Sequence, residues 1–167
     1  MRKLIYSLTG VLILVFMSCA ATVPLTEQEK TYQKIIEFDL SKDELFTRSL
    51  DWATSNFTGS HQLVFQTTLL DKGETLQTGV QNKDKESGSI QSNGFVEIVS
   101  FPVLKLKYSC RIDCKDKRVR MTFNNFQYYF DAGVNMRSWA DVNKGMVNKL
   151  IPELDKLISD YKSKINS

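Results

Sequence analysis

The chain has 167 residues, of which 42% are hydrophobic and 25% charged, proportions that suit one globular domain with a leader or tail. Without Arg2 and Lys3 of the N-terminal leader, 20 basic residues stand against 19 acidic ones, a mature net charge of +1. A charge this small excludes a strong bulk attraction to nucleic acid or to an acidic surface.

The first 18 residues have the features of a bacterial export leader. Two basic residues precede a mainly apolar run over 4–17, which has signal-peptide length and is shorter than the roughly 20 residues of a membrane span. The leader ends in Phe16-Met17-Ser18, and a small residue directly before Cys19 resembles the lipobox of bacterial lipoproteins. The lipobox usually has leucine where this chain has Phe16. The resemblance implies that 1–18 is a signal peptide and that Cys19 becomes the lipidated N-terminus.

A lipidated Cys19 anchors a protein in the bacterial cell envelope, because several acyl chains on one residue hold firmly without a transmembrane helix. The outer membrane or its periplasmic face is the expected location. Residues 19–30 are polar and include Pro24, which indicates a short tether before a single domain over 31–167. An ordinary signal peptide cut near Cys19 and an uncleaved signal anchor are the alternatives.

The domain is expected to begin with a strand and a helix. Residues 31–40 are rich in β-branched and aromatic side chains, which favours a strand. Ser41 and Glu44 then match a capping box, in which each side chain bonds a backbone donor of the first helical turn. Apolar residues recur at helical spacing as far as Phe57. Residues 61–79 show no clear pattern, and His61 is interpreted as a surface residue.

Three short strands are expected next, over 77–82, 87–91 and 95–101. The polar residues 83–86 separate the first two strands, and Ser92-Asn93-Gly94 predicts a second turn or a bulge.

The clearest pattern is a hairpin over 104–123, where apolar and polar side chains alternate strictly, so that one face of both strands is apolar. Asp116 and Lys117 are the expected two-residue loop. Asp113 then faces Arg120 on the polar side, an opposite-charge pair that stabilises by roughly 0.2–1 kcal/mol. The same register sets three apolar pairs opposite each other, namely Cys114 with Val119, Ile112 with Met121 and Cys110 with Phe123.

After the hairpin the apolar side chains move from odd-numbered to even-numbered positions, namely Phe126, Tyr128 and Phe130. One extra residue at Asn124-Asn125 returns these side chains to the apolar face, which predicts a β-bulge or a strand break there.

A second helix is expected near the C-terminus, after a loop over 131–137. Ser138, with Asp141 three residues later, resembles a helix start, and apolar residues keep a helical spacing as far as Ile165. Pro152 lacks a backbone donor, so a kink or a break is expected near 148–151.

These elements predict an α+β fold, an antiparallel sheet of about five strands with two helices packed on one face. Their order resembles a bacterial family of unknown function whose fold is like that of the TATA-box-binding protein. The resemblance rests on SKDELF at 41–46 with Trp52 and Asn56-Phe57 behind it, DKESGSI at 84–90 and KDKRVRMTF at 115–123. It covers roughly 35–130 and implies no known activity, cofactor or catalytic residue. The family often has glycine where this chain has Lys117, which leaves the turn type at 115–118 open.

The polar face of the hairpin carries a row of basic side chains, Lys105, Lys107, Arg111, Lys115, Arg118 and Arg120, of which all but Lys115 are taken as the candidate binding face. Two interpretations stay open: a solvated surface, and a binding face for an anionic partner such as an envelope protein, a glycan or lipid headgroups. Nucleic acid is not expected as a partner, because its binding proteins place aromatic side chains among the basic ones. The aromatic residues of this hairpin lie on the other face.

The sequence shows no constellation typical of an enzyme. Cys110 and Cys114 lie about 13 Å apart along one strand, too far for a disulfide, and are expected as buried free thiols. Phosphate loops, nucleophile elbows and zinc motifs do not occur, and no cofactor or metal is expected.

The pattern therefore favours a non-catalytic binding or assembly module tethered to the envelope. The alternative is a lipid or small-ligand carrier with a pocket between the helices and the sheet. A hydrolase whose site the sequence hides is the third hypothesis.

Replacing Cys19 tests the anchor. Cys19→Ala removes the thiol that the acyl chains would modify, so the variant should incorporate no radiolabelled palmitate in cells where the wild type is labelled. Undiminished labelling of the variant would contradict the lipoprotein prediction.

Overall fold

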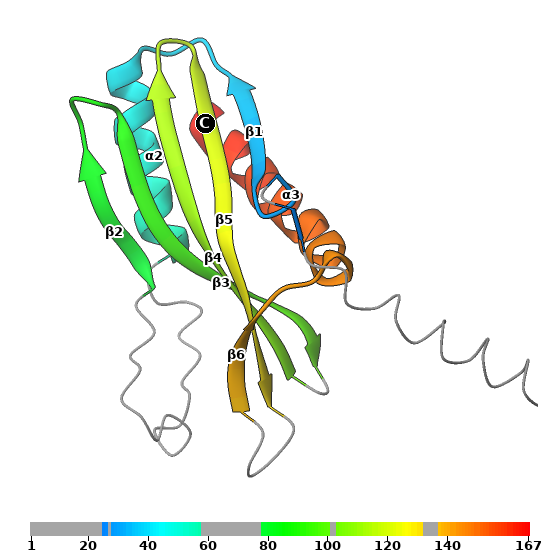
Figure 1. Ribbon diagram of the computed structural model, residues 1–167. Coiled ribbons are helices and arrows are strands. Elements are labelled where there is room, and N and C mark those ends of the chain that lie inside the picture. The colour runs from blue at the N-terminus through cyan, green and yellow to red at the C-terminus, as the bar shows by residue number, and fades with distance from the viewer. Residues whose placement is uncertain (1–24, 27, 58–77, 101–102, 132–136) are drawn as a thin grey trace, which may run out of the picture.

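The computed structural model describes residues 25–26, 28–57, 78–100, 103–131 and 137–167. The elements in these ranges are β1 Tyr32–Glu37, α2 Lys42–Phe57, β2 Gly79–Asp84, β3 Ser89–Ser100, β4 Val103–Lys115, β5 Arg118–Asp131, β6 Arg137–Asp141 and α3 Lys144–Asn166. The strands form one antiparallel sheet in the order β1-β5-β4-β3-β2, and β6 also pairs with β5. Both helices lie on the same side of this sheet (Figure 1). The predicted α+β architecture is confirmed.

Helix α2 starts with the predicted capping box. The Ser41 backbone N–H donates to Glu44 Oε2 at 3.0 Å, and the Glu44 N–H donates to Ser41 Oγ at 3.4 Å. Asp116 adds a cap from the distant hairpin loop, because its Oδ1 accepts from the Lys42 N–H at 2.9 Å. The first turn of α2 is thus fixed to the tip of the β4–β5 hairpin.

The β4–β5 hairpin has the predicted register, including all three apolar pairs and the pair of Asp113 with Arg120. Lys115 pairs with Arg118, so Asp116 and Lys117 form the two-residue loop. Of these two, only Lys117 has a positive φ, of 60°, so the loop is not the primed turn that needs positive φ at both positions. The Lys117 backbone is held on both sides, since its N–H donates to the Leu40 carbonyl at 3.0 Å and its carbonyl accepts from the Phe38 N–H at 2.8 Å.

The predicted bulge is present in β5. Ser109 pairs with Asn124 and Lys107 with Gln127, so two residues of β5 stand opposite Tyr108 alone. Asn125 takes a left-handed φ of 53°. The extra residue returns the next side chain, Phe126, to the packed face, where it is buried.

Residues 92–94 lie within β3 and do not form the predicted turn or bulge. Gly94 pairs with Tyr108 of β4. A Cβ at Gly94 would lie 2.7 Å from the Tyr108 hydroxyl oxygen. Glycine occupies this position because the tyrosine leaves no room for a side chain, and not because the chain turns. The turn between β2 and β3 spans 85–88 instead of 83–86 and places Gly88 at a φ of 73°.

The predicted start of the second helix is wrong. Ser138 belongs to β6, which gains its backbone hydrogen bonds from the edge of β5. Asn143 is the N-cap of α3, and its Oδ1 accepts from the Met146 N–H at 3.0 Å. Of the kink or break predicted near 148–151, the break is wrong, because α3 continues through Pro152. Pro152 lies on the exposed side of the helix, where water can bond the Asn148 carbonyl that loses its donor.

The core fills the space between the helices and the sheet. Its fully buried side chains include Leu45, Ile90, Leu106, Ile112, Met121, Phe123, Leu150, Leu154 and Tyr161. Two polar contacts meet at Ser49 of α2 in this core: its Oγ lies 2.7 Å from the Tyr161 hydroxyl of α3 and accepts from Cys114 Sγ of β4 at 3.5 Å. The leader with Cys19, and most of 61–79 with His61, lie outside the described residues.

Candidate binding surface

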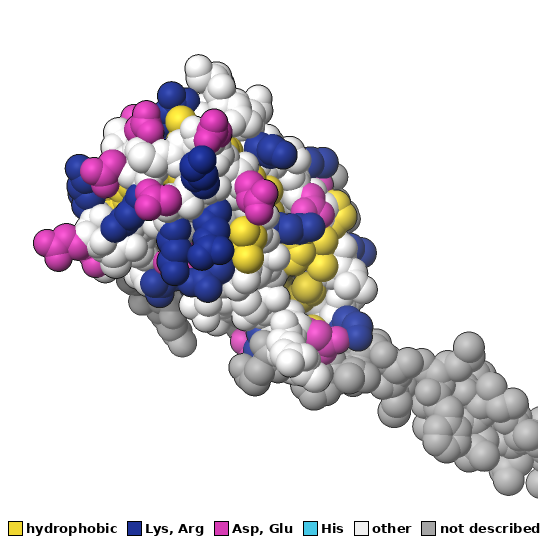
Figure 2. Space-filling model, turned by 90° about the horizontal axis from the view of Figure 1, so that it is seen from above, with side chains coloured by type: hydrophobic (Ala, Val, Ile, Leu, Met, Phe, Trp, Pro, Cys, Tyr) yellow, Lys and Arg dark blue, Asp and Glu magenta, His cyan; other side chains and the backbone are white. Residues whose placement is uncertain are grey.

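The face of the sheet opposite the helices presents polar side chains, because residues along each strand point alternately to the two faces. Near the β4–β5 loop this open face carries Arg111, Asp113, Lys115, Arg118 and Arg120. Figure 2 looks down on this end of the molecule and shows basic side chains gathered in one cluster, with acidic side chains around it.

A hollow of about 170 Å³ lies on the open face, lined by Ile35, Asp113, Lys115, Arg118 and Arg120; we name it the tip hollow. Ile35 of the edge strand β1 pairs with Arg120 and is 61% exposed. Its neighbour Ile36 is 7% exposed and packs into the core. Sequence reasoning missed Ile35 as a surface residue, although the period of two that buries Ile36 also turns Ile35 outward.

The predicted basic row is divided by the structure. Arg111, Arg118 and Arg120 lie at or beside the tip hollow. Lys107 lines a different and larger hollow, of about 710 Å³, next to the bulge. The Lys105 side chain lies outside the described part of the chain.

The bulge shapes this larger hollow. Asn125 Nδ2 donates to Ser109 Oγ at 3.3 Å, and the Ser109 hydroxyl donates to Asn93 Oδ1 at 3.0 Å. The three side chains link β5, β4 and β3 across the open face. These side chains also form hydrogen bonds with one another, so this wall of the hollow is polar but already hydrogen-bonded.

Asp113 forms ion pairs with two of the predicted arginines. Its Oδ1 accepts from Arg111 Nε at 2.8 Å, and its Oδ2 accepts from Arg120 Nη2 at 2.9 Å and Nε at 3.2 Å. The Asp113 side chain is 12% exposed. Burial acts to raise the pKa of Asp113, but the hydrogen bonds from the two guanidinium groups outweigh it and hold the pKa below its usual value.

Lys115 and Arg118 face each other across the hairpin loop and add two further positive charges. Among the residues that the structure describes, neither side chain has an ion-pair or hydrogen-bond partner. Lys117 differs, because its ammonium lies 3.2 Å from Asp39. Two positive charges without an ion-pair partner among the described residues therefore stand beside the exposed Ile35, and Glu37 of β1 is opposite Arg118 in the sheet.

The buried thiols offer no reactive chemistry. Cys110 and Cys114 are free and fully buried, as predicted. Burial raises the pKa of both thiols, so they stay protonated at neutral pH. Within the described ranges, no three His, Cys, Asp or Glu side chains are grouped to hold a metal ion. No helix in those ranges has the length and apolar character needed to cross a membrane.

Together these features define an α+β domain with one face of its antiparallel sheet covered by helices and the other open and charged. A family model matches residues 32–129, and the chain belongs to this family, the domain of unknown function DUF4468 with a TBP-like fold. The search of curated proteins gives no match.

Two solved structures show the same fold. A TBP-like protein from Parabacteroides distasonis ATCC 8503 is similar with a TM-score of 0.64 and 18% identity, over 86% of this chain and 97% of that one. A DUF4468 family protein from Bacteroides ovatus ATCC 8483 is similar with a TM-score of 0.60 and 12% identity, over 87% of this chain and 91% of that one.

Asp113→Asn tests the electrostatics of the open face. Because folding lowers the pKa of Asp113, its carboxylate stabilises the protein above the pKa of the unfolded state, near 4, and this contribution is lost as the pH falls through the folded-state pKa. At pH 7 the variant should lose about 1 kcal/mol of unfolding free energy, measured by urea denaturation.

The difference from the wild type should shrink as the pH falls below about 4. The control Asp51→Asn, at an exposed position of α2, should change stability by less than about 0.5 kcal/mol. A loss for Asp113→Asn that is equal at pH 7 and at low pH would contradict the ion-pair account.

Proposed function

We propose that the chain is a non-catalytic binding module, tethered to the bacterial cell envelope through a lipidated Cys19, that docks an acidic segment of an envelope protein at the tip hollow. The observation that carries the proposal is the position of two unpaired cations, Lys115 and Arg118, beside the exposed Ile35. An acidic side chain on the partner neutralises the cations, and an adjoining apolar side chain covers Ile35.

The geometry favours a protein partner over lipid headgroups or glycans, which share the anionic chemistry. β1 runs from Tyr32, near the expected tether, to Glu37, near the hairpin tip (Figure 1). Its six residues span roughly 20 Å, so the tip lies at the end of β1 that is farther from the attachment of an N-terminal anchor. A glycan offers little apolar surface for Ile35.

The titratable groups of the interior support a non-catalytic role. Burial raises the pKa of Tyr108, Cys110 and Tyr161, so all three groups stay neutral at physiological pH and make poor bases or nucleophiles. Glu44, whose pKa is lowered by hydrogen bonds with Ser41, serves as a helix cap. These shifts have structural causes and do not mark a reaction centre.

A second candidate function, a carrier for a small ligand, is favoured by one observation. A hollow of about 280 Å³ lies between the two helices and the sheet. Small-molecule pockets usually measure roughly 300–1,000 Å³, and this hollow lies just below that range, so it suits a very small molecule and not a whole lipid. The two functions use opposite faces of the sheet and are compatible.

Photo-crosslinking from position 35 tests the docking proposal. With p-benzoylphenylalanine in place of Ile35, the full-length protein in cells should crosslink to an envelope protein, because this side chain lines the tip hollow. Combining Lys115→Glu with Arg118→Glu places like charges against an acidic partner, so the crosslink yield should fall about tenfold or more.

The matched control combines Lys149→Glu with Lys162→Glu, which makes the same change in net charge at exposed positions of α3. It should leave the crosslink yield unchanged. Equal yields from the two double variants, or no crosslink from position 35, would overturn the docking proposal.

A further inference from the structure

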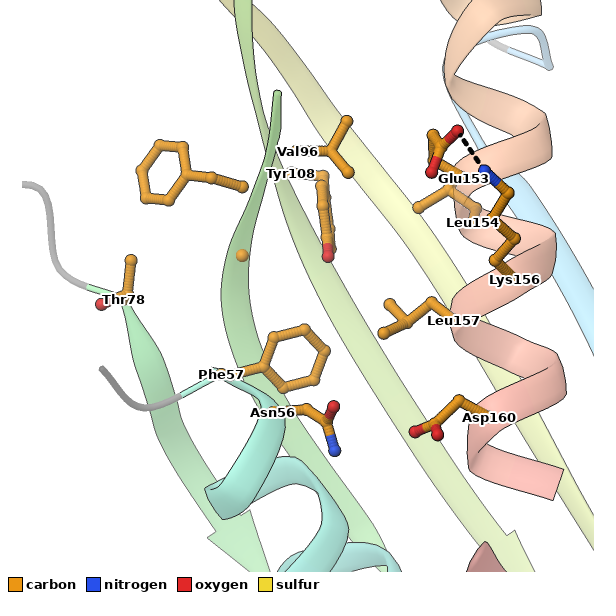
Figure 3. A pocket seen from close by; sticks show the side chains of 12 residues that line it. Asn56, Phe57, Thr78, Val96, Tyr108, Glu153, Leu154, Lys156, Leu157 and Asp160 are labelled. Atoms are coloured by element: carbon orange, nitrogen blue, oxygen red, sulfur yellow. Dashed lines mark hydrogen bonds and ion pairs between the residues drawn. The ribbon is translucent and has the colours of Figure 1, made fainter. Parts of the chain in front are cut away.

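The hollow between the helices and the sheet has apolar walls and a polar edge. Phe57 comes from the end of α2, Val96 from β3, and Leu154 and Leu157 from α3, and in Figure 3 the two leucines point from the helix toward Tyr108 of β4. The side chains of Asn56, Glu153, Lys156 and Asp160 also line it. We name this space the Tyr108 hollow.

Tyr108 is held in one position by its neighbours. Its ring packs edge-on against Phe57 and Phe123, with centroids 6.4 and 5.7 Å away. Gly94 beneath it leaves no room for a Cβ, since that atom would lie 2.8 Å from the Tyr108 Cζ. The residue is 4% exposed, so its hydroxyl is fixed against the hollow it lines.

The Tyr108 hydroxyl has no hydrogen-bond partner among the described residues, which sets it apart from two other tyrosines of the core region. The Tyr32 hydroxyl donates to Asp155 at 2.5 Å, and the Tyr161 hydroxyl lies 2.7 Å from Ser49 Oγ. No buried side-chain N or O atom of the described residues lacks a partner, so the Tyr108 hydroxyl oxygen is accessible from the hollow, where water or a ligand can bond it. Because burial raises the pKa of Tyr108, its hydroxyl stays protonated and is available as a donor.

The charged groups at the edge of the hollow already have hydrogen-bond partners. Lys156 Nζ lies 2.8 Å from Glu153 Oε1, and Asp160 Oδ2 accepts from Trp52 Nε1 at 2.9 Å. A ligand therefore meets apolar walls and the Tyr108 hydroxyl, with the Asn56 amide and the Asp160 carboxylate at the edge of the hollow. Because apolar walls disfavour any charged group and the Asp160 carboxylate repels an anion, this combination favours an uncharged acceptor.

We propose that the Tyr108 hollow binds a small uncharged molecule that has an apolar ring or branched chain and one hydrogen-bond acceptor, which takes the proton of the Tyr108 hydroxyl. An apolar cavity of about 150 Å³ is enough for benzene. A volume of about 280 Å³ thus accommodates a ring with a substituent. The site lies across the sheet from the tip hollow and does not depend on the docking proposal.

Two probes of nearly the same shape test this site. Cyclohexanone carries a carbonyl oxygen where methylenecyclohexane carries a CH₂ group, so only the ketone accepts a hydrogen bond. Each is titrated into the full chain while the methyl NMR signals of Val96, Leu154 and Leu157 are followed. Both probes should shift these signals. Tyr108→Phe should weaken cyclohexanone binding about 3–10-fold and leave methylenecyclohexane binding unchanged.

Tyr108→Phe keeps the ring and removes a hydroxyl that has no partner in the described structure, so the variant retains the fold. Tyr161→Phe is the matched control, because it removes a bonded hydroxyl outside the hollow and should leave the affinity for both probes unchanged. No shift of these methyl signals with cyclohexanone, as expected if the hollow holds only water, would overturn the proposal. Equal affinity of wild type and Tyr108→Phe for cyclohexanone would also overturn it.

Discussion

The register between β4 and β5 is the constraint on which the rest of the structure depends. It sends Ile112 and Met121 to the helix side of the sheet and Arg111 and Arg120 to the open side. A slip by one residue reverses both sets. A fully buried aliphatic or methionine side chain contributes roughly 1.5–3 kcal/mol, so exposing the inward row of this hairpin costs about as much as the roughly 5–15 kcal/mol by which a whole domain is stable. The tip hollow and the Tyr108 hollow therefore lie on opposite faces of the same pair of strands.

The loop end and the bulge end of the β4–β5 pair have different structural roles. At the loop, Asp116 caps α2 and the Lys117 backbone holds the chain between β1 and α2, so the segment that displays Lys115 and Arg118 also fixes the helix beneath it. At the bulge, the extra residue Asn125 keeps aromatic side chains on the packed face and sets two residues of β5 opposite Tyr108. The tip hollow and the Tyr108 hollow thus each lie near one of these irregular points of the hairpin.

Features that depend only on the pattern of neighbouring residues in the chain were predictable from the sequence. The alternation over 104–123 and the change of parity after Phe123 gave the register and the bulge, because burial on a strand follows a period of two. Two residues were predicted wrongly because distant contacts override their local preference. Gly94 favours a turn, but the close approach of Tyr108 decides its place in β3. Ser138 favours a helix start, but pairing with the edge of β5 makes it part of a strand.

The same distinction applies to the candidate sites. The basic residues could be assigned to the open face by parity alone. Which of them remain without a partner depends on the reach of Asp113 to both Arg111 and Arg120, and no spacing rule supplies that geometry. The free hydroxyl of Tyr108 is likewise a property of the assembled helices and strands, because its partners would have to come from α2, β3 or α3.

Hydroxyl-radical footprinting with mass spectrometry tests most directly whether the sheet has one packed and one open face. Ile35 and Ile36 are adjacent in sequence but 61% and 7% exposed, and Met121, an easily oxidised side chain, is fully buried. In the native protein, Ile35 should be modified while Ile36 and Met121 stay protected until the chain is unfolded. Oxidation of native Met121 at the rate of the unfolded chain, or faster modification of Ile36 than of Ile35, would contradict this account.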